Sequence, residues 1–350
     1  MLILSFALDD PAGNAHSAAH WLDQVRRAEE GALDFVTLGD SFAPPPPGSA
    51  GRLDAVAVLA RVAPATRHIG LVPTVTTTHT EPFHTSTALA TLDHVSEGRA
   101  GWLVEVSRGP AEAAAFGRKP AAPEAELWAE AADAAEVAAR LWDSWEDDAE
   151  IRDVATGRFI DRDKLHYIDF EGRFFSVRGP SIVPRPPQGR PPIVLALNAA
   201  DHPARRELAA RHADLVLLEA AAATAGSAVA ALREQVAAAG RDPRAVRVLL
   251  RLAVELGGDS RSPRPPAPAA GYRGSPAGLA ELLAARQAET GADGFHLTSA
   301  NPAADLAALV AETLPPLRAR GLFRGRYQGS TLRNHLGLPR PANRYAKEAS

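Results

Sequence analysis

The sequence predicts an α/β fold, a (β/α)8 TIM barrel, and three observations lead to this prediction. Short apolar runs of strand length alternate with longer amphipathic runs of helix length along the chain. Eight such pairs occur in 350 residues, and eight is the number of units in a closed parallel barrel. Similar phrases recur where a helix leads into a strand, namely Gly31-Ala-Leu-Asp, His212-Ala-Asp and Gly291-Ala-Asp. An open, doubly wound sheet is the alternative, but eight units at the length of one domain favour closure.

The predicted strands are short and apolar, and a predicted helix follows each of them. The strands are expected at residues 2–8, 35–38, 69–75, 101–106, 193–197, 215–218, 246–254 and 294–297. The helices are expected at residues 16–31, 53–63, 82–95, 124–145, 203–212, 227–239, 276–290 and 302–320. A Pro-rich loop is expected at 260–270 and an extended polar tail at 321–350. We therefore predict that residues 1–350 form a single barrel domain.

One region interrupts this alternation. Residues 143–192 contain the phrase Glu171-Gly-Arg-Phe-Phe and a Pro-rich run from Pro180 to Pro192. So long an interruption inside a compact domain usually has a function. We predict an insertion before the fifth strand that includes a small hairpin and lies over the mouth of the barrel.

The composition excludes several classes of function. The net charge is −4 and Lys and Arg form no tract, so neither nucleic acid nor an anionic membrane is an expected partner. The chain has no cysteine, which excludes disulfides, thiolate nucleophiles and Cys-ligated metals. His16 and His20 lie four residues apart without a third ligand, so no metal site is expected. The apolar start ends at Asp9 and predicts a strand rather than a signal peptide, so we expect a cytoplasmic protein.

One phrase is specific enough to indicate a family. Residues 92–102 read Leu-Asp-His-Val-Ser-Glu-Gly-Arg-Ala-Gly-Trp, at the turn between the predicted third helix and fourth strand. Further phrases follow in order at 141–145, 170–180, 184–191, 209–214, 320–324 and 331–338. With these phrases the chain resembles the bacterial-luciferase-like flavin monooxygenases, in particular the branch of nitrilotriacetate and dibenzothiophene-sulfone monooxygenases.

The resemblance implies a two-component monooxygenase. Reduced FMN, supplied by a separate flavin reductase, would lie at the carboxyl ends of the strands and react with O2 to oxygenate a small organic substrate. A homodimer or homotetramer is implied, and other branches of the superfamily use the deazaflavin F420 instead. The cofactor-binding positions of the family correspond here to Asp40, Thr74, Leu103, Ser107, Trp128, Asn198, Ala200, Asp201 and His202.

The sequence departs from the family beside the expected flavin ring. Leu103 replaces the family's Asn, and Glu105, two residues further along the same strand face, replaces an apolar residue. Ser107 matches the family's serine. A carboxylate is therefore expected near the ring where an amide has been lost.

The expected phosphate turn also differs. The family has a Gln-Ala-Gly-Ser-Ser turn with a later glycine, whereas this chain has Asn198-Ala-Ala-Asp-His and then Arg205. Small residues let backbone N–H groups approach a phosphate at a helix N-terminus, and Asp201 would repel it. The alternative interpretation makes Asp201 an ordinary N-cap for the helix that Pro203 opens. His202 or Arg205 could compensate for the lost contacts.

Two family arginines are also missing. Leu127-Trp128 stands where the family often has Arg-Tyr, and Thr87 replaces an arginine of the third helix. Both losses lower the positive potential that an anionic cofactor needs. A second hypothesis follows, in which the barrel has lost flavin, has no cofactor and serves another catalytic or binding role.

Three residues are candidates for catalysis. Arg251 shares a strand face with Leu249, and if this face points inward Arg251 could pair with Glu105 inside the barrel. Otherwise Arg251 faces the helices and its stem covers apolar surface. His79 lies near the expected mouth, where it is either a general acid or base or a capping residue.

Overall fold

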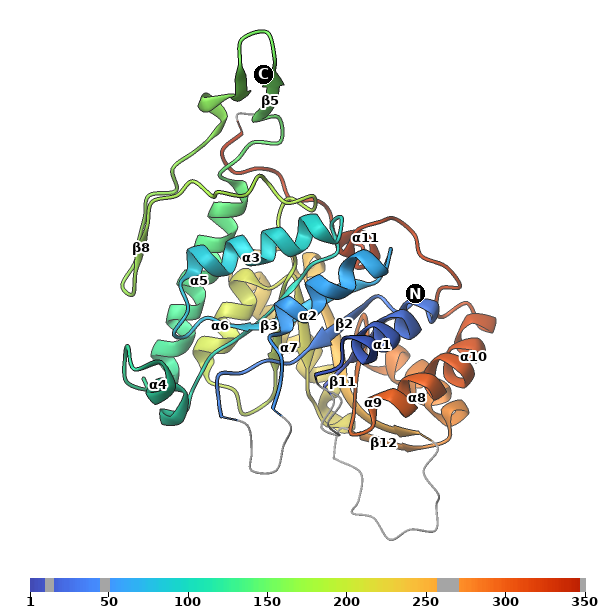
Figure 1. The fold of residues 1–350 in the computed structure, drawn as a ribbon. Coiled ribbons are helices and arrows are strands. Elements are labelled where there is room, and N and C mark those ends of the chain that lie inside the picture. Colours follow the sequence, from blue (N-terminus) through green and yellow to red (C-terminus); the bar gives the residue numbers. More distant parts are fainter. Residues whose placement is uncertain (10–15, 45–50, 257–270, 347–350) are drawn as a thin grey trace.

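In the computed structural model, which describes residues 1–9, 16–44, 51–256 and 271–346, eight strands form a closed parallel barrel (Figure 1). In their order around the ring, the strands are β1 (Ile3–Ala7), β2 (Phe35–Leu38), β3 (Gly70–Thr76), β4 (Trp102–Glu105), β9 (Ile193–Leu197), β10 (Leu215–Leu218), β11 (Arg247–Leu256) and β13 (Gly294–Ser299). Pairing of β13 with β1 and of β10 with β11 closes the ring. The predicted TIM barrel is confirmed. The Pro-rich loop predicted at 260–270 lies outside the described residues.

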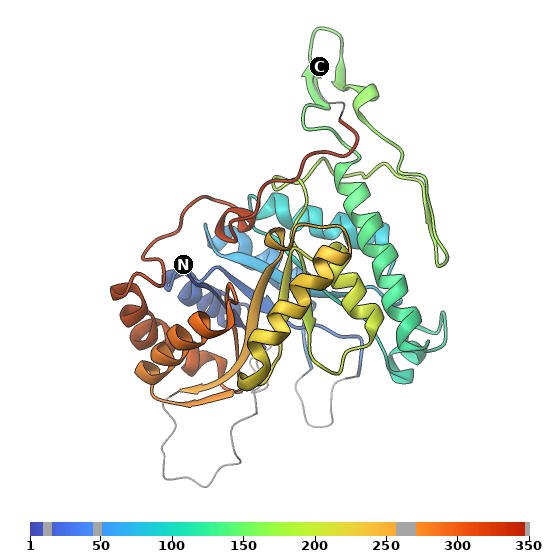
Figure 2. The same ribbon diagram turned by 180° about the vertical axis from the view of Figure 1, so that it is seen from behind.

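Helices cover the outside of the barrel (Figures 1 and 2). They are α1 (Ala18–Glu30), α2 (Ala55–Val62), α3 (Pro82–Val95), α4 (Pro110–Phe116), α5 (Glu124–Asp143), α6 (Pro203–His212), α7 (Ala225–Ala238), α8 (Pro276–Thr290), α9 (Pro302–Ala308), α10 (Leu314–Ala319) and α11 (Leu332–His335). The helix predicted at 302–320 is interrupted by a π-helical turn, Leu309–Thr313, between α9 and α10. The short helices α4 and α11 were not predicted. A further strand, β12 (Gly271–Gly274), pairs with the end of β11 outside the ring.

The chain's last segment closes the amino-terminal end of the barrel. Inward-facing apolar side chains of the strands, such as Phe35 and Leu249, form one cluster with Leu332, Leu336 and Leu338 of the tail. The predicted extended tail therefore contains a short helix, α11, whose apolar face covers the open end of the strands. Burial of these leucines removes apolar area from water and fastens the tail.

The recurring Gly-Ala-Asp phrases have a structural role. The aspartate that precedes a strand accepts the N–H at the start of a neighbouring strand. The three bonds join Leu4 to Asp34 at 2.8 Å, Ile193 to Asp214 at 3.0 Å, and Val248 to Asp293 at 2.8 Å. Arginines then pair with these carboxylates, as Arg324 does with Asp34 and Arg333 with Asp214. The phrases hold adjacent strands in register at the amino-terminal end.

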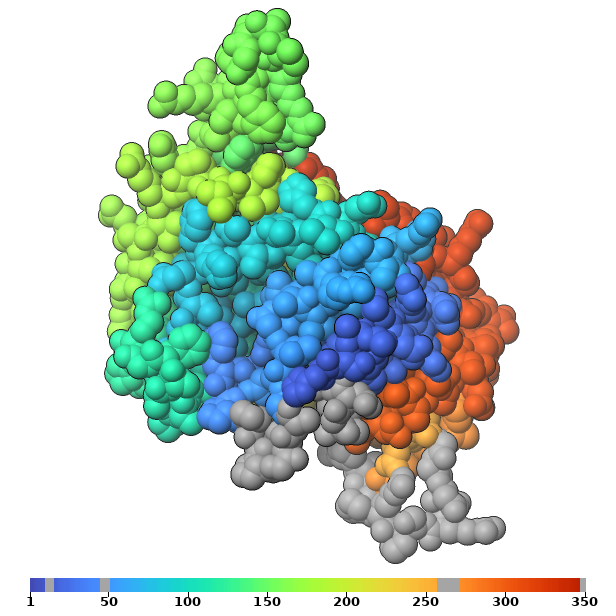
Figure 3. All heavy atoms as spheres, viewed as in Figure 1, coloured from blue at the N-terminus to red at the C-terminus, as the bar shows by residue number. Residues whose placement is uncertain are grey.

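The insertion lies at the end of the barrel opposite to the one predicted. Residues 143–192 form two small hairpins, β5 (Glu150–Asp153) with β6 (Arg158–Ile160) and β7 (Phe170–Glu171) with β8 (Ser176–Val177). The β5–β6 hairpin stands out from the body beyond the end of α5, at the top of Figure 3, whereas the β7–β8 hairpin lies alongside α5 (Figure 1). Near the end of the segment, Arg185 forms an ion pair with Asp143, at its start, at 3.0 Å. The prediction of a cover over the mouth is wrong, because a segment between a helix and the next strand enters at that strand's amino end.

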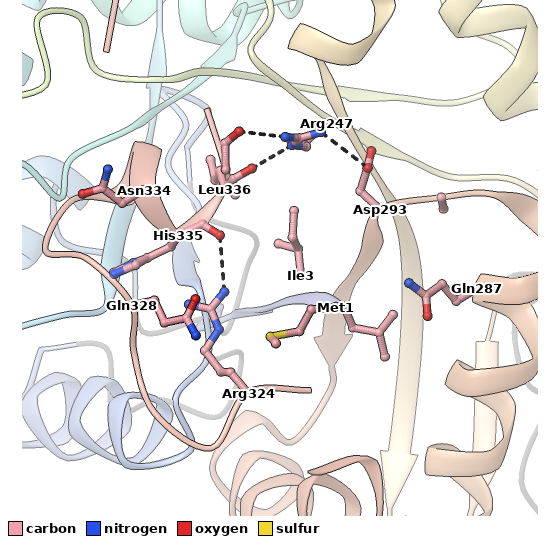
Figure 4. A pocket seen from close by; sticks show the side chains of 13 residues that line it. Met1, Ile3, Arg247, Gln287, Asp293, Arg324, Gln328, Asn334, His335 and Leu336 are labelled. Carbon is pink, nitrogen blue, oxygen red and sulfur yellow. Dashed lines mark hydrogen bonds and ion pairs between the residues drawn. The ribbon is translucent and has the colours of Figure 1, made fainter. Parts of the chain in front are cut away.

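A cavity of about 450 Å³ lies beneath the tail (Figure 4). Arg247 donates to the carbonyl oxygens of Leu336 at 2.7 Å and Gly337 at 2.8 Å. Arg324 donates to the carbonyl oxygen of His335 at 3.3 Å. These bonds use arginine side chains to hold the tail, and they lie at the stability face of a TIM barrel rather than at its reactive face.

Candidate functional site

A second cavity, of about 290 Å³, lies at the carboxyl ends of the strands, and each of the eight barrel strands contributes a lining residue. This end of a TIM barrel carries the active site in the enzymes that have the fold. We call this cavity the mouth. Of the predicted site residues, it brings together Asp40, Thr74, Leu103, Glu105, Asn198 and Arg251.

The floor of the mouth is a histidine that sequence reasoning missed. His296, an inward-facing residue of β13, is buried with its Nδ1 2.9 Å from Ser5 Oγ and its Nε2 3.4 Å from Thr37 Oγ1. Burial, aided by the charge of Arg251, lowers the pKa of His296 to about 3. The imidazole is therefore neutral near pH 7 and offers the mouth a hydrogen-bonding group without a charge. Strand alternation in the last barrel strand could have indicated that the His296 side chain points inward.

Glu105 forms one wall of the mouth, and its partners differ from the predicted one. One carboxylate oxygen lies 3.0 Å from Arg205 and the other lies 3.0 Å from Arg108. Arg251 instead lies 3.3 Å from Glu219 at the half-exposed rim. The predicted Glu105–Arg251 pair is wrong, because two nearer guanidinium groups occupy both oxygens of Glu105. Of the two orientations considered for Arg251, the structure has the inward one, since its side chain lines the mouth.

Trp128 lies behind this wall and is fully buried. Its ring has the guanidinium of Arg205 at 4.5 Å and that of Arg108 at 5.3 Å from its centroid, distances typical of cation–π contacts. Its indole N–H donates to Glu124 at 3.0 Å, and this bond, together with Arg108, lowers the pKa of Glu124. Trp128 therefore holds the two arginines of the wall and does not itself line the mouth.

The turn between β9 and α6 is closed by its own side chains. Asp201 Oδ2 accepts the N–H of Asn198 at 2.6 Å, and Asn198 Oδ1 accepts the N–H of Ala200 at 2.7 Å. The N-cap of α6 is His202, whose Nδ1 accepts the N–H of Ala204 at 3.1 Å. The prediction that Asp201 caps the helix is wrong, because Asp201 precedes the cap and its carboxylate turns back to Asn198 and to Arg205 at 3.1 Å.

This turn does not fit the phosphate of FMN. The N–H groups of Asn198, Ala200 and Ala204 are bonded within the chain, and the carboxylate of Asp201 already pairs with Arg205. Ala200 stands where the family has glycine. A phosphate dianion placed here would also face the negative charge of Asp201. The mouth itself, at about 290 Å³, lies at the lower end of the range for ligand pockets, roughly 300–1,000 Å³.

Polar groups without partners gather near the mouth. In the part of the chain that the structure describes, Thr76 Oγ1, Ser107 Oγ and Arg205 Nε are buried and have no hydrogen-bond partner. Thr76 is the register partner of Glu105, and Ser107 lies two residues beyond it. Because buried polar groups are normally bonded, these atoms indicate a polar ligand or water at this end of the barrel.

Two of the predicted residues, His79 and Asp40, have contacts that stabilise the fold near the mouth. His79 has a backbone φ of 67°, and its ring stacks on Phe116 at 5.1 Å. Burial and the charge of Lys119 lower the pKa of His79, and its side chain is not among those that line the mouth. Asp40 accepts the N–H of Ala55 at 2.9 Å and so fixes the start of α2, and burial raises the pKa of Asp40.

Residues 1–9, 16–44, 51–256 and 271–346 contain neither a cluster of metal ligands nor a membrane-spanning helix. Within those ranges no group of three His, Asp or Glu side chains is arranged to hold a metal ion. Within the same ranges no helix is both long and apolar enough to cross a membrane.

The chain is similar in sequence and in fold to known monooxygenases. The luciferase-like monooxygenase family matches residues 1–262. Nitrilotriacetate monooxygenase component A from Aminobacter aminovorans is 32% identical over 96% of this chain and 94% of that protein. Dibenzothiophene-sulfone monooxygenase from Rhodococcus erythropolis is 29% identical over 95% of this chain and 92% of that protein. The solved structure of EDTA monooxygenase from Chelativorans sp. BNC1 has the same fold, with a TM-score of 0.84 at 22% identity, covering 97% of this chain and 99% of that chain.

Proposed function

This chain belongs to the luciferase-like monooxygenase family, and we propose that it oxygenates a small organic molecule in the mouth with a reduced flavin. The predicted family and the predicted class, a flavin-dependent monooxygenase, are confirmed by the family match and by the relatives. The mouth is the observation that carries the proposal. Residues from all eight strands line it, and those from β2, β3, β4, β11 and β13 are polar, whereas the tail covers the opposite end of the barrel.

Each polar residue of the mouth has a role that its contacts support. Arg251, at the half-exposed rim, can bind an anionic or carbonyl group of a substrate. Glu105 holds Arg205 in place and acts as a positioning residue. His296 offers an uncharged imidazole on the floor. His79, stacked on Phe116, shapes the region beside the mouth rather than moving a proton.

The cofactor of the proposal is a reduced flavin delivered by a separate reductase. Flavin supplies the oxygen chemistry in enzymes of this kind, while the protein orients it and excludes water. FMN was predicted, but the turn at Asn198 does not fit its phosphate, so no reaction step is assigned through FMN. F420, a homodimer or homotetramer, and a cytoplasmic location stay predictions.

A second candidate function is a barrel that binds a small molecule without flavin. Two observations favour it over an ordinary member of the family. The turn before α6 is satisfied internally by Asp201, and Leu103 stands where the family has an amide. Under this hypothesis the Glu105–Arg205 pair fills space that a cofactor occupies in the relatives.

Anaerobic binding of reduced flavin tests the proposal directly. Equilibrium dialysis with photoreduced riboflavin and reduced FMN should give a dissociation constant for at least one of them on the order of micromolar. Ala196→Phe, which fills the mouth, should weaken binding by about tenfold or more. Ala155→Phe, in the exposed turn between β5 and β6 and away from the mouth, is the matched control and should bind as wild type does. If wild type binds neither reduced flavin, the flavin proposal is wrong and the second candidate replaces it.

A further inference from the structure

The anion site of the turn before α6 is filled by the chain itself. Asp201 Oδ2 accepts the N–H of Asn198 at 2.6 Å, and its Oδ1 lies 3.1 Å from Arg205 and 3.3 Å from Asn198 Nδ2. The Asp201 side chain is only 7% exposed. A carboxylate therefore already has the backbone donor, the side-chain donor and the cation that a bound anion would need.

Arg205 is the group for which a phosphate would compete. Its side chain is 7% exposed, its two terminal nitrogens are bonded to Asp201 and Glu105, and its guanidinium lies over the ring of Trp128. Its Nε is buried without a partner among the residues that the structure places. The cation is thus shared by two carboxylates, and an incoming dianion would have to displace one of them.

Displacement would be unfavourable because the displaced carboxylate stays nearby. Asp201 is tethered within the turn, so a phosphate on Arg205 would lie close to two negative side chains with one shared cation. Like charges in a poorly solvated site repel strongly. Pro203 has no N–H to offer, and the N–H of Ala204 is used by His202.

We propose that Asp201 substitutes for the ligand's phosphate, so that the mouth takes a phosphate-free flavin of the riboflavin type and discriminates against FMN. This inference rests on the proposed function for its flavin ring and adds the class of flavin that the site accepts. The ring end of the ligand meets the mouth beside Glu105, whose register partner Thr76 has an unpartnered hydroxyl. The far end meets Asp201 and Asn198, which suit a neutral hydroxyl better than a dianion.

Affinities for riboflavin and FMN, both reduced, test this inference in wild type and in Asp201→Ser. Wild type should bind riboflavin at least as tightly as FMN. Asp201→Ser retains an acceptor for the N–H of Asn198 and leaves Arg205 paired with Glu105 alone, so it should raise the affinity for FMN relative to that for riboflavin about tenfold. Glu207→Ser removes an equal charge from the exposed face of the same helix and should change neither affinity. Binding of FMN by wild type about tenfold more tightly than riboflavin would overturn the inference.

If wild type binds no flavin, both the proposed function and the choice of a riboflavin-type ligand are wrong, and a second measurement tests separately whether Asp201 occupies an anion site. Inorganic phosphate is then titrated while the melting temperature is followed. Phosphate should stabilise Asp201→Ser and leave wild type and Glu207→Ser unchanged. Equal stabilisation of wild type, or none in Asp201→Ser, would show that Asp201 does not occupy an anion site.

Discussion

The two ends of the barrel use the same kind of ion pair for different purposes. At the amino-terminal end, Arg324 and Arg333 of the tail pair with Asp34 and Asp214, which hold neighbouring strands. At the carboxyl end, Arg205 pairs with Glu105 and Asp201 inside the site where a ligand is expected. Ion pairs at the first end join the tail to the strands, whereas we propose that the pairs at the second end select the ligand.

The largest expected effect is at the amino-terminal end. Arg324→Ala leaves the fully buried Asp34 without its cation, and breaking a buried pair in this way costs about 3–5 kcal/mol of unfolding free energy. Urea denaturation at pH 8 measures this loss. Arg320→Ala, which removes an exposed pair with Glu281, should leave the midpoint unchanged. An equally small effect for Arg324→Ala would show that the tail is not fastened by this pair.

Asp93 gives the amino-terminal end a pH dependence. Its carboxylate accepts hydrogen bonds from Gln188 and Ala100, yet burial raises the pKa of Asp93 to about 6. Because this pKa lies above the unfolded value, the contribution to stability is fully present below about pH 4 and is lost as the pH rises through about 6. The loss amounts to roughly 3 kcal/mol at most.

Asp93→Asn removes the titrating group and keeps an acceptor for the two donors on Oδ1, although it loses the bond that Oδ2 accepts from the N–H of Gln188. The unfolding free energy of wild type should fall relative to that of this variant between about pH 4 and pH 6, because the pKa of Asp93 is about 6 in the folded protein and near 4 in the unfolded chain. Chemical denaturation at several pH values measures the difference. Parallel profiles for the two proteins would contradict the assignment.

The corresponding change at the mouth should cost less. Arg205→Ala leaves Glu105 with Arg108 and leaves Asp201 with the N–H and Nδ2 of Asn198, so we expect a loss of about 1–3 kcal/mol. The same urea experiment applies, with Arg211→Ala, an exposed pair on the same helix, as the control. A loss larger than that of Arg324→Ala would mean that the ion pairs at the mouth stabilise the fold more than those at the amino-terminal end of the barrel do.

The smallest effect is expected from the insertion. Replacing residues 151–159, the projecting hairpin of β5 and β6, with a short Gly-Ser link should change stability by no more than about 1 kcal/mol. Flavin binding should not change, because this hairpin lies at the end of the barrel away from the mouth. A loss of binding without a loss of stability would show that the hairpin reaches the mouth in solution.

Sequence reasoning found the barrel because hydrophobic periodicity specifies local structure. Pro82 opens α3 and Pro203 opens α6, as predicted, since proline suits the first turn of a helix. Short α4 was missed because its few apolar residues form no recognisable periodic run. The insertion was misplaced although chain order alone fixes its end, because a helix-to-strand segment joins the amino end of the next strand.

The site was predicted less completely than the fold. Strand alternation placed Glu105 inside the barrel and left two orientations for Arg251, and which charges pair depends on distances between strands and helices far apart in sequence. Arg205 reaches Glu105 across 100 positions, and no local pattern indicates this pair. Asp201 and His202 are adjacent and both suit a cap, so only the backbone path decides that His202 caps α6.

A crystal structure of the protein with a reduced flavin bound tests the central claim most directly. The account predicts the flavin ring in the mouth, beside Thr74 and Leu103, with Asp201 still bonded to the N–H of Asn198 and to Arg205. A flavin phosphate seated on the turn at residues 198–202, with Asp201 displaced from Arg205, would contradict it.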